Sequence, residues 1–158
     1  MDDIDRSLVS RLVSDGRAPY ADLARAVGLS LSATKRRVDR LVADGAIRGF
    51  TAVVDPLLMG WALSASVELF TTGTVPVERM KRDLDGMPEV VSAETVSGGA
   101  DAVLRVVASD ARHLERVVSR LRALTYVQQT NTVLLLSNLL SRPTPLTSAA
   151  RSAGGQPQ

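Results

Sequence analysis

Apolar residues recur at helical spacing in three segments within the first 45 residues. In the first segment Leu8 and Leu12 are four residues apart, and similar patterns follow Pro19 and Ser30. Glycines follow all three segments, as they commonly do at helix ends. The pattern therefore predicts three helices, over residues 4–15, 20–27 and about 30–44.

The connection between the second and third helices is short and contains a glycine. Only Gly28, Leu29 and a capping serine separate them, which is typical of a helix-turn-helix. After Gly45 the residues Ile47 to Val54 are rich in β-formers. We expect a strand or small hairpin there, of the kind called a wing.

The second half of the chain has a different pattern. From Leu63 to Leu69 apolar residues alternate with polar ones, as in a half-buried strand. A helical pattern follows Pro76, and Asp110 can cap another helix. Turn residues between 96 and 102 separate two further strands. The predicted order is strand 63–69, helix 77–84, strands 89–96 and 102–108, a helix after 110, and a strand from 128 to about 136.

This βαββαβ order is that of a ferredoxin-like domain. The fold class is therefore α+β, with an N-terminal winged helix-turn-helix and a ferredoxin-like second domain. The predicted divisions are residues 1–50 for the winged helix-turn-helix, 51–60 for a linker strand or hinge, 61–140 for the second domain, and 141–158 for a tail whose proline, glycine and serine content predicts disorder.

The last predicted strand contains an unbroken apolar run from Val133 to Leu136. An open sheet with one wet face alternates, so this run indicates that both faces are covered. The helices of one small domain cover only one face. A second subunit is the economical explanation.

Composition excludes several classes of function. Only 3% of the 158 residues are aromatic, which leaves little surface for stacking single-stranded bases. The chain has no cysteine, and His113 is its one histidine, so we expect neither a metal nor another cofactor. The acidic N-terminus does not resemble a signal peptide and no segment is long and apolar enough to span a membrane, so we expect a cytoplasmic protein.

The third predicted helix concentrates positive charge although the net charge is only +2. At about 100° per residue, Val38 faces the core, and Arg36 and Arg40 point away from it. Such a ridge is usually a solvated face. Its position in the second helix of a helix-turn-helix favours DNA binding, because that helix enters the major groove.

Arg36 is the leading candidate for reading bases, because arginine donates two hydrogen bonds to guanine. Ser30, Ser32 and Lys35 lie beside it. Phosphate contacts fix the position of a protein on the duplex without reading its sequence. The candidates for such contacts are Arg17, Tyr20, Arg37, Arg40 and Arg48. Arg37 is open to a second interpretation, in which it braces the fold through an acidic partner.

With these residues in place, the chain resembles the Lrp/AsnC family of feast/famine regulators. The resemblance rests on five segments in the expected order: IDRSLVSRLVSDGR, LARAVGLS, RVDRLVADGAIRGF, DPLLMG and VSGGADAVLRV. It implies dimers built through the sheets, further assembly into a tetramer of dimers, binding to double-stranded promoter DNA and a response to an amino acid.

The resemblance also implies an effector site at the Gly-x-x-Asp turn. Carried over, that site comprises Gly98, Gly99, Ala100 and Asp101, with Thr95, Val133 and Leu134 as weaker candidates. A carboxylate suits an α-ammonium, and glycine amides suit an α-carboxylate if they form a nest. A plain hairpin turn explains the same residues.

Two residues depart from the family pattern. Leu31 replaces a helix-starting proline, and Ala100 replaces an aromatic residue common in the turn. Two other functions also stay open. One is an architectural DNA-binding protein without an effector. The other is an enzyme similar to siroheme decarboxylases, which share the family's fold but whose chemistry needs more histidines than this chain has.

Overall fold

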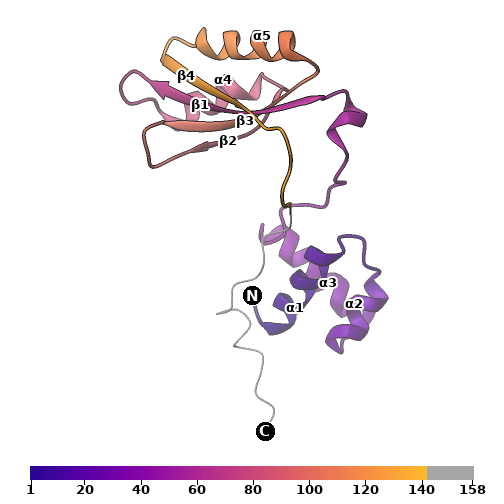
Figure 1. Cartoon of the computed structure of the whole chain (residues 1–158). Coiled ribbons are helices and arrows are strands. Elements are labelled where there is room, and N and C mark those ends of the chain that lie inside the picture. Colours follow the sequence, from indigo (N-terminus) through magenta and orange to yellow (C-terminus); the bar gives the residue numbers. More distant parts are fainter. Residues whose placement is uncertain (142–158) are drawn as a thin grey trace. The chain divides into compact units, whose positions relative to one another are not determined.

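The computed structural model describes residues 1–141. These residues form two compact units, one within residues 1–53 and one over residues 54–139, and each is described by itself (Figure 1). The division lies inside the predicted linker. Of the predicted tail, residues 142–158 lie outside the described residues.

The first unit is a cluster of three helices, α1 (Asp3–Ser14), α2 (Tyr20–Val27) and α3 (Leu31–Ala43). All three predicted helices are therefore confirmed. Gly28 ends α2 with a φ of 67°, a left-handed conformation that glycine adopts without strain. The helices meet around the buried side chains of Leu8, Leu23 and Val38.

The predicted strand over residues 47–54 is not formed in this chain. No strand is assigned between α3 and residue 62, and residues 51–54 are exposed. A strand needs a neighbouring strand to bond its amides and carbonyls, and no other segment of residues 1–141 pairs with this one. The β-forming residues of this segment are therefore not sufficient for a strand, because no neighbouring strand is present to pair with it.

The second unit begins with a short 3-10 helix, η1 (Pro56–Met59), which replaces the predicted break at the Asp-Pro pair. The remaining elements follow the predicted βαββαβ order. They are β1 (Leu63–Thr71), α4 (Val77–Asp85), β2 (Val90–Thr95), β3 (Ala102–Ala108), α5 (Ala111–Arg122) and β4 (Val127–Leu134). None of the helices in the described residues is long and apolar enough to cross a membrane.

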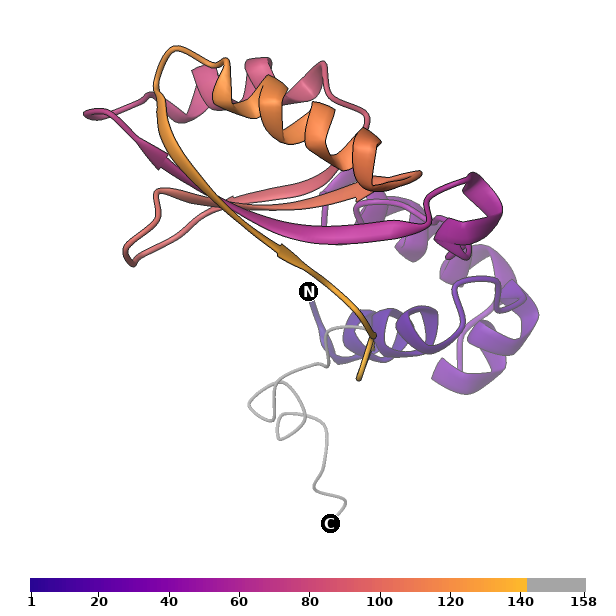
Figure 2. The ribbon, with the colours of Figure 1, turned by 45° about the horizontal axis from the view of Figure 1, so that its top comes forward.

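The four strands form one antiparallel sheet in the order β2-β3-β1-β4. Both α4 and α5 lie on the same face of this sheet (Figure 2). Alternate residues of the central strands point toward these helices, so Val67, Leu69, Leu104 and Val106 are fully buried. The core of this unit therefore lies between the sheet and its two helices.

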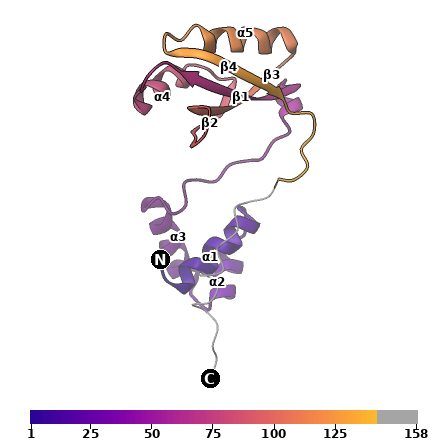
Figure 3. The same ribbon diagram turned by 60° about the vertical axis from the view of Figure 1, so that its left-hand side comes forward.

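The opposite face of the sheet has no α-helix of the same unit over it (Figure 3). Serines and Glu68 of β1 face this side, beside Val133, which is 52% exposed. The apolar run predicted to be covered on both faces is exposed at each of its four residues in the single chain, and Leu136 is 91% exposed.

We expect the two faces of the sheet to respond differently to truncation. Replacing buried Leu104 by alanine leaves a cavity in the core and should cost about 2 to 5 kcal/mol of the unfolding free energy of this unit. Replacing half-exposed Val133 by alanine should cost less than about 1 kcal/mol. Urea unfolding followed by circular dichroism measures both, and equal losses would contradict the placement of the core.

Candidate DNA-binding helix and effector site

The first turn of α3 is fixed by Ser30. Its side-chain oxygen accepts a hydrogen bond from the amide of Ala33 at 3.2 Å, which satisfies one of the free amides at the helix start. Thr34, one turn along, is fully buried and donates to the carbonyl of Ser30 at 3.0 Å. The rotation of α3 about its axis is therefore set by residues at its start.

This rotation leaves three of the predicted DNA-contact residues on the exposed side of α3. Ser32, Lys35 and Arg36 are all exposed, whereas Val38 and Leu41 are buried. Within residues 1–141, Lys35 and Arg36 form no ion pair. Both cations are therefore available to an outside partner.

Arg37 and Arg40 are held differently, by acidic residues at the start of α1. Arg37 donates to Asp2 at 2.6 Å and to Asp5 at 2.8 Å, and Arg40 donates to the second oxygen of Asp5 at 2.9 Å. The side chain of Asp5 is only 2% exposed. The brace anticipated for Arg37 is thus present, and Arg40 shares it. These ion pairs link α1 to α3.

The same contacts keep Asp5 ionised. Burial opposes the charged form, but hydrogen bonds from Arg37 and from the amide of Asp2 outweigh it, so the pKa of Asp5 lies below its ordinary value of 3.8. Asp2 completes the arrangement by capping α1, because its side chain accepts from the amide of Asp5. The cluster is therefore charged throughout the neutral range.

The remaining candidates in this unit lie outside α3. Arg17 and Arg48 are both exposed and line one cleft, of about 820 Å³, between α1 and the segment after α3. Tyr20 begins α2 and is 37% exposed. Phe50 lines the same cleft as the two arginines. The structure thus brings together two predicted phosphate contacts that are 31 residues apart in sequence.

In the second unit, Asp101 ties the β2-β3 turn to the end of β1. One of its carboxylate oxygens accepts from the amide of Thr71 at 2.7 Å and from the hydroxyl of Thr71 at 3.0 Å. Its own amide donates to the carbonyl of Leu69 at 2.9 Å. Asp101 therefore holds the turn in place, and its second oxygen has no hydrogen-bond partner within residues 1–141.

The glycines of the turn are exposed, but they do not form the nest considered from the sequence. Neither Gly98 nor Gly99 has a positive φ, and an αR-αL nest needs one left-handed residue. Ala100 beside them is half-buried. An anion would have to meet these amides one at a time.

Of the three weaker effector candidates, Val133 and Leu134 are not brought to this turn within one chain. Val133 pairs with Ser66, whereas the turn is bonded to Thr71 at the other end of β1. Five residues of strand separate the two positions by about 17 Å. Only Thr95, which pairs with Ala102 at the base of the hairpin, lies next to the turn.

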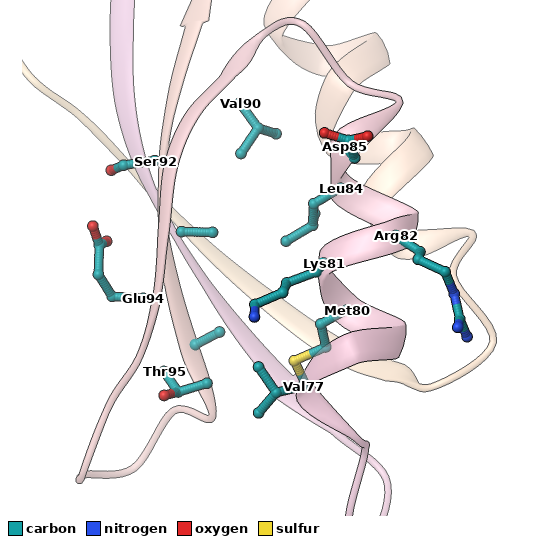
Figure 4. Close-up of a pocket in the computed structure, with 12 residues that line it drawn as sticks. Val77, Met80, Lys81, Arg82, Leu84, Asp85, Val90, Ser92, Glu94 and Thr95 are labelled. Atoms are coloured by element: carbon teal, nitrogen blue, oxygen red, sulfur yellow. The ribbon is translucent and has the colours of Figure 1, made fainter. Parts of the chain in front are cut away.

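A groove that the sequence analysis missed lies between α4 and the edge strand β2 (Figure 4). Its volume is about 580 Å³, and it reaches Thr95 and Ala102 at the base of the same hairpin. The residue spacing predicted both α4 and β2. The distance between the helix and the strand, however, depends on how α4 packs on the sheet. The local pattern of apolar and polar residues does not predict that distance.

A serine, a histidine and a carboxylate also meet at the start of α5, an arrangement that the sequence analysis did not anticipate. The hydroxyl of Ser109 lies 3.1 Å from Nδ1 of His113, and Nε2 lies 3.2 Å from Glu89. Arg120 already donates to both oxygens of Glu89, and the Ser109 hydroxyl also contacts Asp110. We interpret the set as an anchor for the start of α5. Residues 1–141 contain no cluster of three or more metal-ligating side chains.

Comparison with protein families gives two matches. Residues 1–42 match the AsnC-type helix-turn-helix domain, and residues 64–145 match the Lrp/AsnC ligand binding domain. Among named relatives, the HTH-type transcriptional regulator Rv2324 of Mycobacterium tuberculosis is 41% identical over 92% of this chain and 98% of its own length. The regulator LrpA of the same organism is 37% identical over 85% of this chain and 90% of its own length.

Solved structures agree with these matches. The crystal structure of the Mycobacterium tuberculosis leucine response regulatory protein LrpA superposes with a TM-score of 0.83, at 33% identity, and covers 93% of this chain and all of that one. A feast or famine regulatory protein of the same organism, solved in complex with L-methionine, gives a TM-score of 0.82 at 36% identity, with 89% and 95% covered.

We expect Asp5 to contribute to stability through its arginine partners. Asp5→Asn removes the buried charge and should lower the unfolding free energy of the helical unit by roughly 1 to 3 kcal/mol at neutral pH. Because the pKa of Asp5 is lowered on folding, this contribution is present above pH 3.8 and is lost as the pH falls below it. Thermal melts between pH 7 and pH 3 measure both effects.

The matched control is Asp3→Asn, which removes an exposed ion pair with Arg6 from the same helical turn. This change should cost less than about 1 kcal/mol. If both variants lose the same stability, or if Asp5→Asn shows the acid dependence of the wild type, the role assigned to the buried carboxylate is wrong.

Proposed function

Because the chain belongs to the Lrp/AsnC family of helix-turn-helix transcriptional regulators, we propose that it binds specific double-stranded DNA sites through α3 and that an amino acid modulates this binding. The observation that carries the proposal is the state of Lys35 and Arg36. Both are exposed on the second helix of a helix-turn-helix and have no ion-pair partner in the described part of the chain, while the neighbouring arginines are paired with acidic residues of α1. A helix whose charges only keep the protein in solution does not need some cations paired with α1 and others left exposed.

Arg36 reads bases in this proposal. Its guanidinium can donate two hydrogen bonds to one guanine, and such a contact discriminates between bases by about 1 to 3 kcal/mol. Ser32 and Lys35 flank it on the exposed side of α3. Ser30 caps the helix with its side chain, so we assign it a positioning role at the DNA-facing end.

Phosphate contacts come from the cleft that Arg17 and Arg48 line, with Tyr20 at the start of α2. Arg40 keeps half of its side chain exposed beside its ion pair, so it can still approach a phosphate. Arg37 is only 26% exposed and holds two carboxylates, so we assign it to the brace alone. These contacts set affinity and its salt dependence rather than sequence preference.

The effector site is proposed at the Gly98–Asp101 turn. A relative that is 36% identical was solved with L-methionine, which supports an amino acid as the class of ligand. One oxygen of Asp101 holds Thr71, and the second is open to an α-ammonium. Val133 and Leu134 take part only if they belong to another copy of the chain, because within one chain they are about 17 Å or more from the turn.

A homodimer, with further assembly into a tetramer of dimers, completes the proposal. The uncovered face of the sheet and the exposed apolar run from Val133 to Leu136 support it. Apolar residues exposed in a continuous run are costly in a monomer and mark interaction surfaces. A dimer also fits a regulator that binds two related half-sites.

The two arginines assigned to different tasks give the first test of this function. Arg36→Ala should relax base preference at one position of the bound site. Arg48→Ala should weaken all sites alike and reduce the slope of log affinity against log salt by about 1. In vitro selection of bound sequences, followed by gel-shift titration at several salt concentrations, separates the outcomes. Equal behaviour of the two variants would contradict the division of roles.

The effector proposal has its own test at Asp101. Gel-shift titrations of the full chain with each of the twenty amino acids should show at least one that changes affinity, site pattern or oligomer size. Asp101→Asn should abolish that response, because the amide lacks the charge that holds an α-ammonium.

Thr71→Val is the matched control, because it removes one hydrogen bond to Asp101 but leaves the carboxylate intact. If both variants lose the response equally, Asp101 acts only by holding the turn. If no amino acid has any effect on the wild type, the protein is an architectural DNA-binding protein.

A further inference from the structure

The groove between α4 and β2 exists because small side chains face it from the sheet. Ala93 pairs with Leu104 and Thr95 pairs with Ala102, so both β2 residues face the helix side of the sheet. Directly opposite residues of an antiparallel pair share a face. Neither alanine nor threonine reaches α4, and Met80 and Leu84 of the helix only partly fill the gap (Figure 4).

The inner surface of the groove is apolar with a single cation. Val77, Met80, Leu84 and Val90 line it, and the side chain of Lys81 extends into it from α4, whereas Arg82 points away (Figure 4). Ser92 and Glu94 line only the outer rim, because their partners Arg105 and Val103 face the other side of the sheet. Lys81 is therefore the charged side chain that extends between the helix and the strand, and Asp85 lines the groove at the C-terminal end of α4.

Lys81 retains binding capacity. Its ammonium group donates to Glu78 at 2.8 Å, and both side chains are largely exposed. An ammonium group has three donors, so two remain for a ligand. A carboxylate that enters beside the apolar wall can share this lysine with Glu78.

We propose that this groove is a second ligand site, distinct from the turn at Gly98–Asp101, and that it binds an aliphatic carboxylate with no amino group. The aliphatic part lies against Met80, Leu84 and Val90, and the carboxylate meets Lys81. A volume of about 580 Å³ is within the range of small-molecule sites. Short fatty acids and branched 2-oxo acids share this chemistry.

An amino acid fits the groove less well than such an acid. Its α-ammonium would lie near Lys81 and needs a carboxylate partner, but Glu78 is already bonded to Lys81, Glu94 faces the other side of the sheet and Asp85 lies at the far end of α4 (Figure 4). Burying an unpaired ammonium beside another cation is unfavourable. The groove and the turn therefore select different ligands.

The two sites share one structural element. Thr95 and Ala102 form the last pair of the β2-β3 hairpin before the turn that carries Asp101. A ligand in the groove contacts the base of this hairpin, and an effector at the turn contacts its tip. Occupancy of the groove can therefore change the response at the turn.

The experiment titrates full-length protein with octanoate, 4-methyl-2-oxopentanoate, L-leucine and octylamine, by calorimetry and by amide chemical shifts. The two carboxylates without an amino group should bind and shift the amides of Leu84 and Ala93, which line the groove away from the turn. Octylamine, which has the chain but the opposite charge, should not bind. L-Leucine should leave these two amides unshifted. The two binding arms distinguish a fatty acid from a 2-oxo acid.

Three variants locate the site. Ala93→Leu fills the groove and should weaken binding at least about tenfold, which corresponds to roughly 1.4 kcal/mol. Lys81→Met keeps the apolar stem and removes the charge, so the carboxylates should bind several-fold more weakly. Arg82→Met removes a charge from the same helix, but it points away from the groove and should have no effect.

The proposal is overturned if none of the carboxylates binds, if all three variants bind them like the wild type, or if octylamine or L-leucine shifts the same amides. Circular dichroism shows whether each variant is folded, and Lys81→Met decides the matter if Ala93→Leu does not fold. The groove titration needs no DNA. A wild type that binds octanoate but no DNA would contradict the proposed function and leave this site standing.

Discussion

A carboxylate removed from water needs cations close to it, and Asp5 finds two of them on α3. This interaction links the first helix to the basic helix and decides which arginines are left over. Arg37 and Arg40 are held toward α1, whereas Lys35 and Arg36 are exposed and have no ion-pair partner within residues 1–141. The exposed side of α3, where we propose that DNA binds, is therefore defined as much by the acidic start of α1 as by the basic helix itself.

The second unit depends on a different constraint, the coverage of its sheet. Its two helices cover one face and leave the other open, and the apolar end of β4 stays exposed in a single chain. This uncovered surface is the basis of the association with another copy that we propose. The relatives with similar folds are named regulators, and a symmetric partner suits a protein that binds paired half-sites.

The β2-β3 hairpin lies between the two ligand sites that we propose in this unit. Its tip is bonded to the end of β1 through Asp101, and its base forms one wall of the groove beside α4. The same carboxylate therefore has a structural role and an open oxygen. If both proposed sites bind ligands, this hairpin is the element that both ligands contact.

The sequence by itself determined the helices, the strands and their order, because helical and alternating periodicities are local and each element here has clear start and end residues. It also identified the basic side of α3 and the Gly-x-x-Asp turn. Only the tertiary structure decided which cations are free, since the partners of Arg37 and Arg40 lie more than 30 residues away in the chain. Likewise it showed that residues 47–54 lack a strand partner, that Val133 is far from the turn, and that a groove separates α4 from β2. Pairing, distance and empty space depend on how distant segments pack, and no local pattern of residues encodes them.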